Sequence, residues 1–367
     1  MKKIIALLLA VMMLAALCAC GGTADSGAAE PAAPAEEAAP AEEAVEEAPA
    51  EEAAPAEEAA PAEEAAESGL APKDGGSAIN FTTGGDSGTY YAFGGVMAQK
   101  VSEVTSTSVT AITSGGSQAN IYALQDGDAE IGFVQSDVMA YAYNGTRLFE
   151  EDGADNSFSV VGALYMEQVQ IVTLNPDIKT VADLEGKNVS IGAAGSGVYF
   201  NAIDVLGVYG LTEDDINPTY QSFADSVEAL QDGQIDAAFI VAGAPTNAVT
   251  SLAATNDVYL VSIDAEHIAE LTASSPYYTE YTISADTYGM PEDAATVAVG
   301  AVVIASDDVS DVDVYNFLYG VFENLDSLGH DKAGELSLDF ATSVTDVPYH
   351  PGAVQYFADK GIEVAGK

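Results

Sequence analysis

The sequence predicts an α/β fold of two similar lobes with a ligand cleft between them. Short apolar stretches alternate with helical patterns along the chain, which is typical of α/β proteins. The pentapeptide Ala-Leu-Gln-Asp-Gly occurs at residues 123–127 and again at 229–233. A glycine- and serine-rich loop precedes each copy, at residues 84–89 and at 192–197. The repeat therefore predicts two lobes built on one plan.

The N-terminal segment is expected to lie outside this fold. Two lysines precede an apolar run from Ile4 to Leu17. This layout is typical of a secretory signal peptide, and the run is shorter than the ~20 residues of a membrane-spanning helix. Leu17-Cys18-Ala19-Cys20 fits a bacterial lipobox with Cys20 as the modified cysteine. We expect a lipoprotein signal peptide over residues 1–19. An ordinary signal peptide with two incidental cysteines is the alternative.

A segment of biased composition follows Cys20. Residues 28–66 consist almost entirely of alanine, glutamate and proline. The prolines interrupt helix, the glutamates repel one another, and the segment lacks the apolar residues needed for a core. Residues 20–75 are therefore expected to be a disordered tether that begins at the lipidated cysteine. The protein would be lipid-anchored at the extracytoplasmic face of a bacterial cell membrane.

The charge of the chain limits its partners. It carries 58 acidic and 10 basic residues, a net charge of −48. Nucleic acids and anionic lipids are recognised by clustered basic residues, so neither is an expected partner. Both cysteines lie at or before residue 20, so the remainder has no disulfide or cysteine metal site. No metal or cofactor is predicted.

The first lobe is expected over residues 76–165 together with about 305–367. Its amino-terminal part shows strands and helices in alternation, with glycines where they change. The expected strands are 79–83, 109–114 and 129–134, and the expected helices are 89–104 and 120–125.

The second lobe is expected over about 166–304. The expected strands are 169–174, 188–192, 237–241, 258–263 and 296–304, with helices at 181–186, after Gly197 and at 223–230. Tyr199, Ala202, Ile203 and Leu206 show the spacing of one buried helical face. A helix from about 312 to 325 and a tail at 349–353 complete the chain.

Four loops are candidates for holding a ligand: Ser87-Gly88-Thr89, Gly116-Ser117, Ser196-Gly197 and Gly243-Ala244. Each follows an expected strand, and ligands of open α/β sheets bind at the carboxyl ends of the strands. A helix that begins there offers unpaired backbone N–H groups, and glycine permits close approach. The expected side-chain contacts are Ser87, Thr89, Tyr90, Ser117, Asn120, Gln135, Ser196 and Tyr199, with backbone from Gly88, Gly197 and Gly243. The alternative is that the serines and threonines only cap their helices.

Several motifs resemble one family of transport proteins. Residues 81–91, Phe-Thr-Thr-Gly-Gly-Asp-Ser-Gly-Thr-Tyr-Tyr, are similar to the opening motif of TAXI-type solute-binding proteins, the extracytoplasmic receptors of one branch of TRAP transporters. Further matches follow in order at residues 113–120, 132–137, 181–187, 192–197 and 349–353. The resemblance covers nearly all of residues 76–363. It implies a type II periplasmic-binding-protein fold and a receptor that delivers a small organic anion, such as a dicarboxylate or a glutamate-like compound, to a TRAP permease.

Two charged residues affect the expected ligand. Asp86 stands where the family more often has a small neutral residue, so a carboxylate there would compete with an anion or accept an ammonium group. This keeps zwitterions open beside plain dicarboxylates. Arg147, the only arginine, is interpreted as a solvated surface charge. Capture of a carboxylate by arginine is not expected.

Other functions remain as alternatives. An ABC-type receptor of similar fold is one, and an enzyme or a surface-interaction lipoprotein on that fold is another. Gly85-Asp86-Ser87-Gly88 is similar to the nucleophile loop of trypsin-like proteases, but Thr89 replaces the next glycine and the histidines have no matching context. We therefore do not expect an enzyme.

Overall fold

Ten strands build one mixed sheet within residues 70–367, the part of the chain that this computed structural model describes. The strand order is β2-β1-β3-β10-β4-β7-β5-β6, with β8 beside β4 and β9 beside β10. The strands are β1 (Ala78–Thr82), β2 (Ser108–Ile112), β3 (Ile131–Gln135), β4 (Phe158–Thr173), β5 (Asn188–Ser190), β6 (Asn217–Thr219), β7 (Ala237–Ala242), β8 (Tyr259–Leu260), β9 (Thr279–Ile283) and β10 (Ala294–Ser306). The predicted signal peptide, Cys20 and most of the predicted tether lie outside the described residues.

The sheet repeats one pattern of strand pairing. In the first lobe β1 pairs in parallel with both β2 and β3. In the second lobe β5 pairs in parallel with both β6 and β7. Parallel neighbours need a crossover connection, and helices supply it here. The internal sequence repeat therefore corresponds to a structural repeat.

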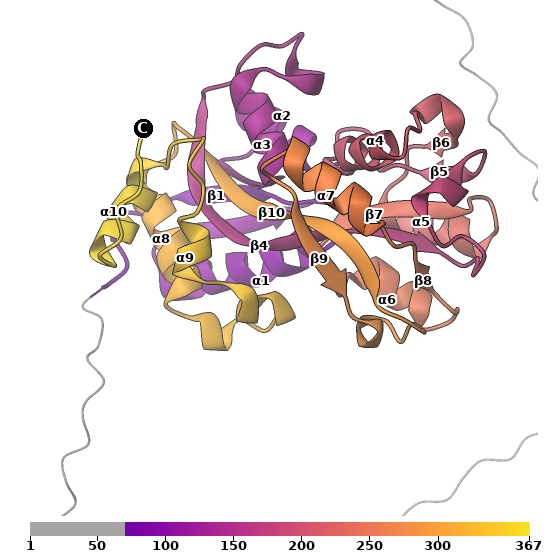
Figure 1. Cartoon of the computed structure of the whole chain (residues 1–367). Helices are drawn as coiled ribbons and strands as arrows, with labels where there is room; N and C mark the ends of the chain where they lie inside the picture. The colour runs from indigo at the N-terminus through magenta and orange to yellow at the C-terminus, as the bar shows by residue number, and fades with distance from the viewer. Residues whose placement is uncertain (1–69) are drawn as a thin grey trace, which may run out of the picture. The chain divides into compact units, whose positions relative to one another are not determined.

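Two long antiparallel strands connect the lobes (Figure 1). β10 pairs with β3 of the first lobe and with β4, and β4 continues past it to pair with β7 of the second lobe. The lobe boundaries expected near residues 165 and 304 fall inside these strands. The repeated order, joined by two crossing strands, is the type II periplasmic-binding-protein architecture, and the predicted fold class is confirmed.

Helices cover both lobes. The α-helices are α1 (Thr89–Val104), α2 (Ser117–Asp126), α3 (Ser136–Asn144), α4 (Val198–Val208), α5 (Phe223–Gln231), α6 (Asn247–Ala253), α7 (Ala265–Ser274), α8 (Asp311–Phe322), α9 (Leu338–Ala341) and α10 (Pro351–Asp359). Short 3₁₀ turns include η1 (Arg147–Phe149), η2 (Val181–Leu184), η3 (Glu213–Asp215) and η6 (Asp331–Glu335). In Figure 1, α1, α8, α9 and α10 lie with β1, while α4, α5 and α6 lie with the second lobe. None of the helices in residues 70–367 has the length and apolar character to cross a membrane.

Each lobe has its own core. One cluster joins strands β1 and β3 with α1, α8 and α10 in the first lobe, and Phe81, Phe133 and Phe317 are fully buried in it. Two clusters, one around Phe239 and one around Ile240, occupy the second lobe. These neighbouring residues of β7 point to opposite faces, so the second-lobe sheet is buried on both sides.

Most expected elements of the first repeat are confirmed, and the differences have local causes. The helix expected at 89–104 matches α1, whereas α3 and the first half of β4 were not predicted. In the second lobe α6, α7 and β9 were not predicted. The expected tail at 349–353 is wrong in part, because Pro351 begins α10. Proline suits the first turn of a helix, where its missing N–H costs no hydrogen bond.

Candidate functional site

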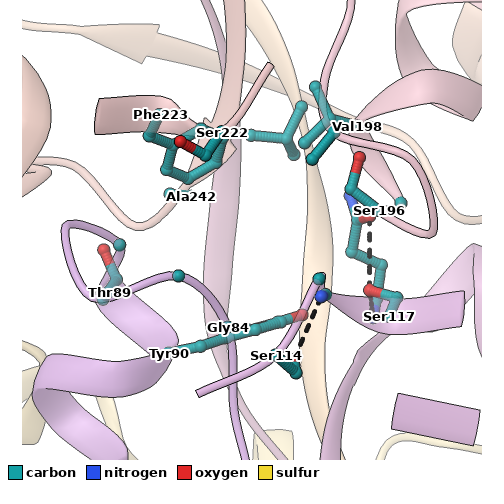
Figure 2. Close-up of a pocket in the computed structure, with 18 of the residues that line it drawn as sticks. Gly84, Thr89, Tyr90, Ser114, Ser117, Ser196, Val198, Ser222, Phe223 and Ala242 are labelled. Atoms are coloured by element: carbon teal, nitrogen blue, oxygen red, sulfur yellow. Dashed lines mark hydrogen bonds between the residues drawn. The ribbon is translucent and has the colours of Figure 1, made fainter. Parts of the chain in front are cut away.

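A cavity of about 150 Å³ lies where the two lobes face each other. Figure 2 shows Gly84, Thr89, Tyr90, Ser114 and Ser117 on the first-lobe side and Ser196, Val198, Ser222, Phe223 and Ala242 opposite them. The lining is completed by Gly85, Gly88, Gly115, Gly116, Gln135, Glu167, Ala193, Gly197, Gln221 and Val241. Both copies of the repeated loop therefore contribute to one cavity.

Four helices begin at lining residues without a side-chain cap, and three of them have glycine at the N-cap. The N-cap residues of α1, α2 and α4 are Gly88, Gly116 and Gly197, and none provides a capping side chain. The first N–H groups of each helix have no partner within the helix, and the helix dipole places partial positive charge there. α3 also begins at a lining residue, Gln135. The cavity is thus surrounded by backbone donors that suit a negatively charged group.

Glycine is required where the loops of the two lobes meet. Gly116 has a φ of 110°, a conformation that favours glycine, and a Cβ there would lie 3.3 Å from Ser196 Cα. A Cβ on Gly197 would lie 1.4 Å from Gln135 Oε1 and 3.0 Å from Ser117 Oγ. Substitution at Gly197 therefore forces Gln135 to move.

Seven of the residues expected at the site line the cavity: Gly88, Thr89, Tyr90, Ser117, Gln135, Ser196 and Gly197. Ser196 is 7% exposed, and its Oγ has no hydrogen-bond partner among the described residues. A buried hydroxyl without a partner costs free energy unless something else satisfies it. Ser196 is accordingly the clearest candidate for a ligand contact.

Asn120 does not line the cavity, because its side chain holds the first lobe together. Asn120 Nδ2 donates to the carbonyl oxygens of Thr83 at 2.6 Å and Phe133 at 2.7 Å. Its Oδ1 accepts from Thr82 Oγ1 at 2.7 Å. All of its side-chain polar atoms are used in joining α2 to the carboxyl end of β1 and to β3.

Ser87 and Gly243 also lie outside the lining, and both form contacts between the lobes. The carbonyl oxygen of Ser87 accepts from the backbone N–H of Ala248 at 3.1 Å. The carbonyl oxygen of Gly243 accepts from Thr89 Oγ1 at 2.8 Å. A third bond runs from the N–H of Ala119 to the oxygen of Gly195 at 3.0 Å. The structure is therefore a closed arrangement of the lobes.

Tyr199 points away from the cavity. Its hydroxyl donates to Glu213 Oε2 at 3.1 Å, and its ring lies 6.5 Å from that of Tyr220. Tyr199 follows Val198, the first residue of α4, and Val198 occupies the cavity side instead. Tyr199 occupies the position in the second copy of the repeat that Tyr90 occupies in the first. Of these two tyrosines, Tyr90 lines the cavity and Tyr199 does not.

Several lining residues were not predicted. Glu167 lies in the middle of β4 and is 2% exposed. In the sequence it is distant from the glycine-rich loops. Its Oε2 accepts a hydrogen bond of 2.6 Å from the hydroxyl of Tyr90. Burial raises the pKa of Glu167 to about 8. Ser222 and Phe223 also line the cavity, at the start of α5. A helix was expected at 223–230, so the start of that helix, which follows a strand of the same lobe, could have indicated these two residues.

The charged side chain found in the lining is acidic. No lysine, arginine or histidine occurs among the described residues that line the cavity, and Glu167 is the carboxylate present. Asp86, the acid singled out in the sequence, is exposed and does not line the cavity. Backbone N–H groups and hydroxyls are therefore the donors available to a ligand.

A family model described as the NMT1-like family matches residues 81–361. The chain belongs to the NMT1-like family. Solved structures similar to this NMT1-like chain include the periplasmic aliphatic sulphonate binding protein SsuA from Escherichia coli, at 20% identity and a TM-score of 0.39. The match covers 62% of this chain and 61% of that protein, less than two thirds of its length.

Two further solved structures are similar to this NMT1-like chain. The alkanesulfonate-binding protein SsuA from Xanthomonas axonopodis pv. citri, bound to MOPS, has 18% identity and a TM-score of 0.40, with 77% of this chain and 83% of that one covered. A putative L-cystine ABC transporter from Listeria monocytogenes has 14% identity and a TM-score of 0.43, with 72% and 98% covered.

A buried polar network joins the lobes of this NMT1-like protein behind the cavity. Gln135 Nε2 donates to Asn201 Oδ1 at 2.6 Å, and Asn201 Nδ2 donates to Asp137 Oδ2 at 2.9 Å. Asp137 is fully buried, and its Oδ1 has no partner among the described residues. Burial raises the pKa of Asp137 to about 7, and the nearby Asp204 acts in the same direction. The lining residue Gln135 is thus coupled to a buried acid at the lobe interface.

Arg147 lies at the edge of the same interface, contrary to its interpretation as a solvated charge. It pairs with Asp204 of α4 at 2.5 Å and lies 5.2 Å from the centre of the Tyr141 ring. The Arg147 side chain is 39% exposed, so its ion pair with Asp204 contributes only modestly to stability. The only arginine of the chain connects the lobes and does not line the cavity.

Proposed function

We propose that this chain is the extracytoplasmic solute-binding component of a membrane transporter and holds a small carboxylate-bearing solute between its lobes. The observation that carries the proposal is the meeting of three uncapped helix starts, at Gly88, Gly116 and Gly197, around one interlobe cavity. Backbone N–H groups and hydroxyls would hold the carboxylate, because no basic side chain is present in the lining.

The opposite wall suits the carbon part of such a solute. Val198, Phe223, Val241 and Ala242 of the second lobe present apolar surface to the cavity. A pocket that is mostly apolar, with a few convergent polar groups, is typical of small-molecule sites. Burial of the ligand's apolar surface against this wall would add affinity. The polar groups of the lining would set the orientation of the ligand.

The finer proposal is a TAXI-type receptor of a TRAP permease. It is supported by the motifs at residues 81–91 and 192–197, whose helix starts meet at the cavity. An ABC-type receptor is the second candidate, because the fold and the interlobe cavity suit both kinds of receptor and the description of the NMT1-like family names no transporter type. Cross-linking in intact membranes separates the two, since an ABC partner complex contains an ATPase and a TRAP complex does not.

Attachment to the membrane is part of the proposal. Cys20 would carry the lipid, and the acidic segment after it would separate the binding unit from the membrane surface. The support comes from the lipobox and from the composition of residues 28–66.

Native mass spectrometry of protein purified from cells tests the proposal. We expect a co-purified small molecule that leaves when the protein is denatured. Ser196→Ala should weaken the binding of that molecule about 10- to 150-fold, the effect of one hydrogen bond to a charged group, without lowering thermal stability. Ser226→Ala is the matched control, since Ser226 bonds Ser190 in the same lobe at 2.8 Å, away from the cavity. The absence of any co-purified molecule, or equal affinity of wild type and Ser196→Ala for the molecule that is found, contradicts the proposal.

A further inference from the structure

The cavity contains one acidic side chain, and its surroundings restrict what can face it. Glu167 reaches the cavity from β4 and is 2% exposed. Tyr90, whose ring stacks on Phe133 at 4.4 Å, donates its hydroxyl to Glu167 Oε2 at 2.6 Å. A buried ionised carboxylate with one neutral donor is poorly stabilised. Glu167 therefore needs either a proton or a cation.

Within residues 70–367 no unpaired cation lies beside Glu167. The charged and titratable groups that act on Glu167 or pack beside it are Tyr90 of α1, Asp137 of α3, Tyr165 of β4 and Lys332 of η6. Lys332 is 1% exposed and is already paired with Glu335 Oε1 at 2.5 Å. Burial outweighs Lys332 in setting the pKa of Glu167, which rises to about 8. In the empty cavity at neutral pH the carboxyl group holds a proton.

The cavity lining offers partners for groups of both charges. The starts of α1, α2 and α4 offer N–H groups to a negative group, and Glu167 offers oxygen atoms to a positive one. A ligand with a carboxylate and an ammonium group satisfies both at once. A ligand with carboxylates alone leaves Glu167 without a partner beyond Tyr90.

We propose that Glu167 is the residue that selects the solute, by pairing with an ammonium group of a zwitterion such as an α-amino acid. This inference rests on the proposed solute-binding function and specifies its ligand class. Asp86, which the sequence offered for the same role, is exposed outside the cavity, so the acid that accepts the ammonium is Glu167.

Binding then releases one proton. The empty protein carries neutral Glu167, and the zwitterion carries no net charge. In the complex the ammonium keeps its proton, Glu167 is ionised, and the proton of its carboxyl group enters the buffer. An opposite charge close to a carboxyl lowers its pKa, so this release is the expected direction. A plain carboxylic anion gives no release from Glu167.

Isothermal titration calorimetry in two buffers of different ionisation enthalpy measures the proton. The probes are the twenty standard L-amino acids, screened by thermal shift, and the deaminated acid matched to each one that binds. At pH 7 we expect wild type to release about one proton more per bound amino acid than Glu167→Gln does, a difference in which any proton taken up by Asp137 on closure cancels. The deaminated partner should bind about 10-fold or more weakly and release none. Glu167→Gln, which resembles the neutral carboxyl in shape, should lose the release and bind the amino acid about 10- to 150-fold more weakly.

Glu228→Gln, at an exposed position on α5, is the control and should keep both the affinity and the proton release. Equal or tighter binding of the deaminated acid, or binding in Glu167→Gln without loss, overturns this inference and leaves the solute-binding function intact. Failure of all twenty amino acids also overturns it. In that case a co-purified molecule without an amine retains the proposed function, and the absence of any such molecule removes both.

Discussion

Thr89 of the first lobe donates its hydroxyl to the carbonyl oxygen of Gly243 in the second lobe, at 2.8 Å. Thr89 also lines the cavity, so the same residue faces the ligand site and fastens one lobe to the other. The carbonyl of Gly243 accepts a second bond from Thr246 Oγ1 at 3.1 Å and would not be left unsatisfied if Thr89 were changed. Closure and ligand contact are therefore joined at one side chain.

Thr89→Val should weaken binding of the solute recovered from the wild-type protein by about 2- to 10-fold. The substitution keeps the size of the side chain and removes one neutral hydrogen bond, worth roughly 0.5–1.5 kcal/mol. Calorimetric titration measures the change. Thr105→Val is the control, since Thr105 bonds Val101 within the first lobe. An unchanged affinity in Thr89→Val would show that this bond does not contribute to the bound state.

Gly197→Ala should reduce ligand affinity more strongly than Thr89→Val. The added Cβ would lie 1.4 Å from Gln135 Oε1, so Gln135 must leave its bond to Asn201 or the lobes must separate. Titration with the recovered solute checks the effect. Gly207→Ala, in the same helix with open space around its Cβ position, should bind normally. Similar affinities for the two variants would contradict the close approach.

Closure should weaken as the pH rises from about 4 to about 7. Asp137 has its pKa raised to about 7 by burial in the closed form. In an open form it regains water and a value near 3.9, so closing takes up a proton. The closed state is favoured fully below the open-state pKa, and this advantage is lost as the pH passes the closed-state value. Asp204, Arg147, Tyr141 and Tyr278 face the same interface and are unchanged by the test below.

Pulsed electron resonance distances between spin labels at positions 125 and 214, both exposed and in different lobes, report closure. The full chain would carry serine at positions 18 and 20 to remove its own thiols. We expect the short-distance population to fall from about pH 4 to about pH 7, and to fall less in Asp137→Asn, in which Glu167 still has a raised pKa. A distribution that does not depend on pH in the wild-type protein rules out Asp137 as the controlling group.

Phe133→Ala should lower the free energy of unfolding by about 3–5 kcal/mol, the usual cost of removing a buried phenylalanine. Phe133 is fully buried and contacts the rings of Phe81 at 4.9 Å and Tyr90 at 4.4 Å. Urea denaturation measures the loss, and the dependence of the free energy of unfolding on urea concentration should be unchanged. Leu148→Ala, at a side chain that is 47% exposed, should have little effect.

Cys20→Ala should release the protein from washed membranes, whereas Cys18→Ala should leave it attached. Cys20 alone has leucine three residues before it and a small residue directly before it. Fractionation followed by immunoblotting distinguishes the variants. Retention of the Cys20→Ala protein on membranes would mean that another feature anchors the chain.

Local signals in the sequence were sufficient for much of the fold. The extent of α1 could be predicted because glycine precedes it and apolar residues recur at helical spacing. The helix starts at Gly88, Gly116 and Gly197 follow from the same local patterns, and their meeting at one cavity follows from the repeat. Features that depend on residues a few positions apart in the chain could therefore be predicted from the sequence.

Glu167 could not be predicted, because its position depends on distant pairing. Glu167 lines the cavity because β4 crosses from one lobe to the other and because Tyr90 of α1 packs against Glu167. Asn120 and Tyr199 show the converse: both follow the loop motifs, yet one bonds to the carboxyl end of β1 and to β3, and the other to Glu213. Local patterns located the loops, and three-dimensional packing decided which side chains face the cavity.

The passage of β4 and β10 through both lobes has a consequence for folding. β4 gives its first half to pairing with β10 and its second half to β7, so neither lobe possesses a complete sheet of its own. The first lobe also needs residues from both ends of the described chain, since α8 packs beside α1 and α10 packs against α8. Severing the chain inside β4 would leave two fragments with open strand edges. The duplicated plan has thus been built into one continuous sheet, in which neither half completes its strand pairing without the other.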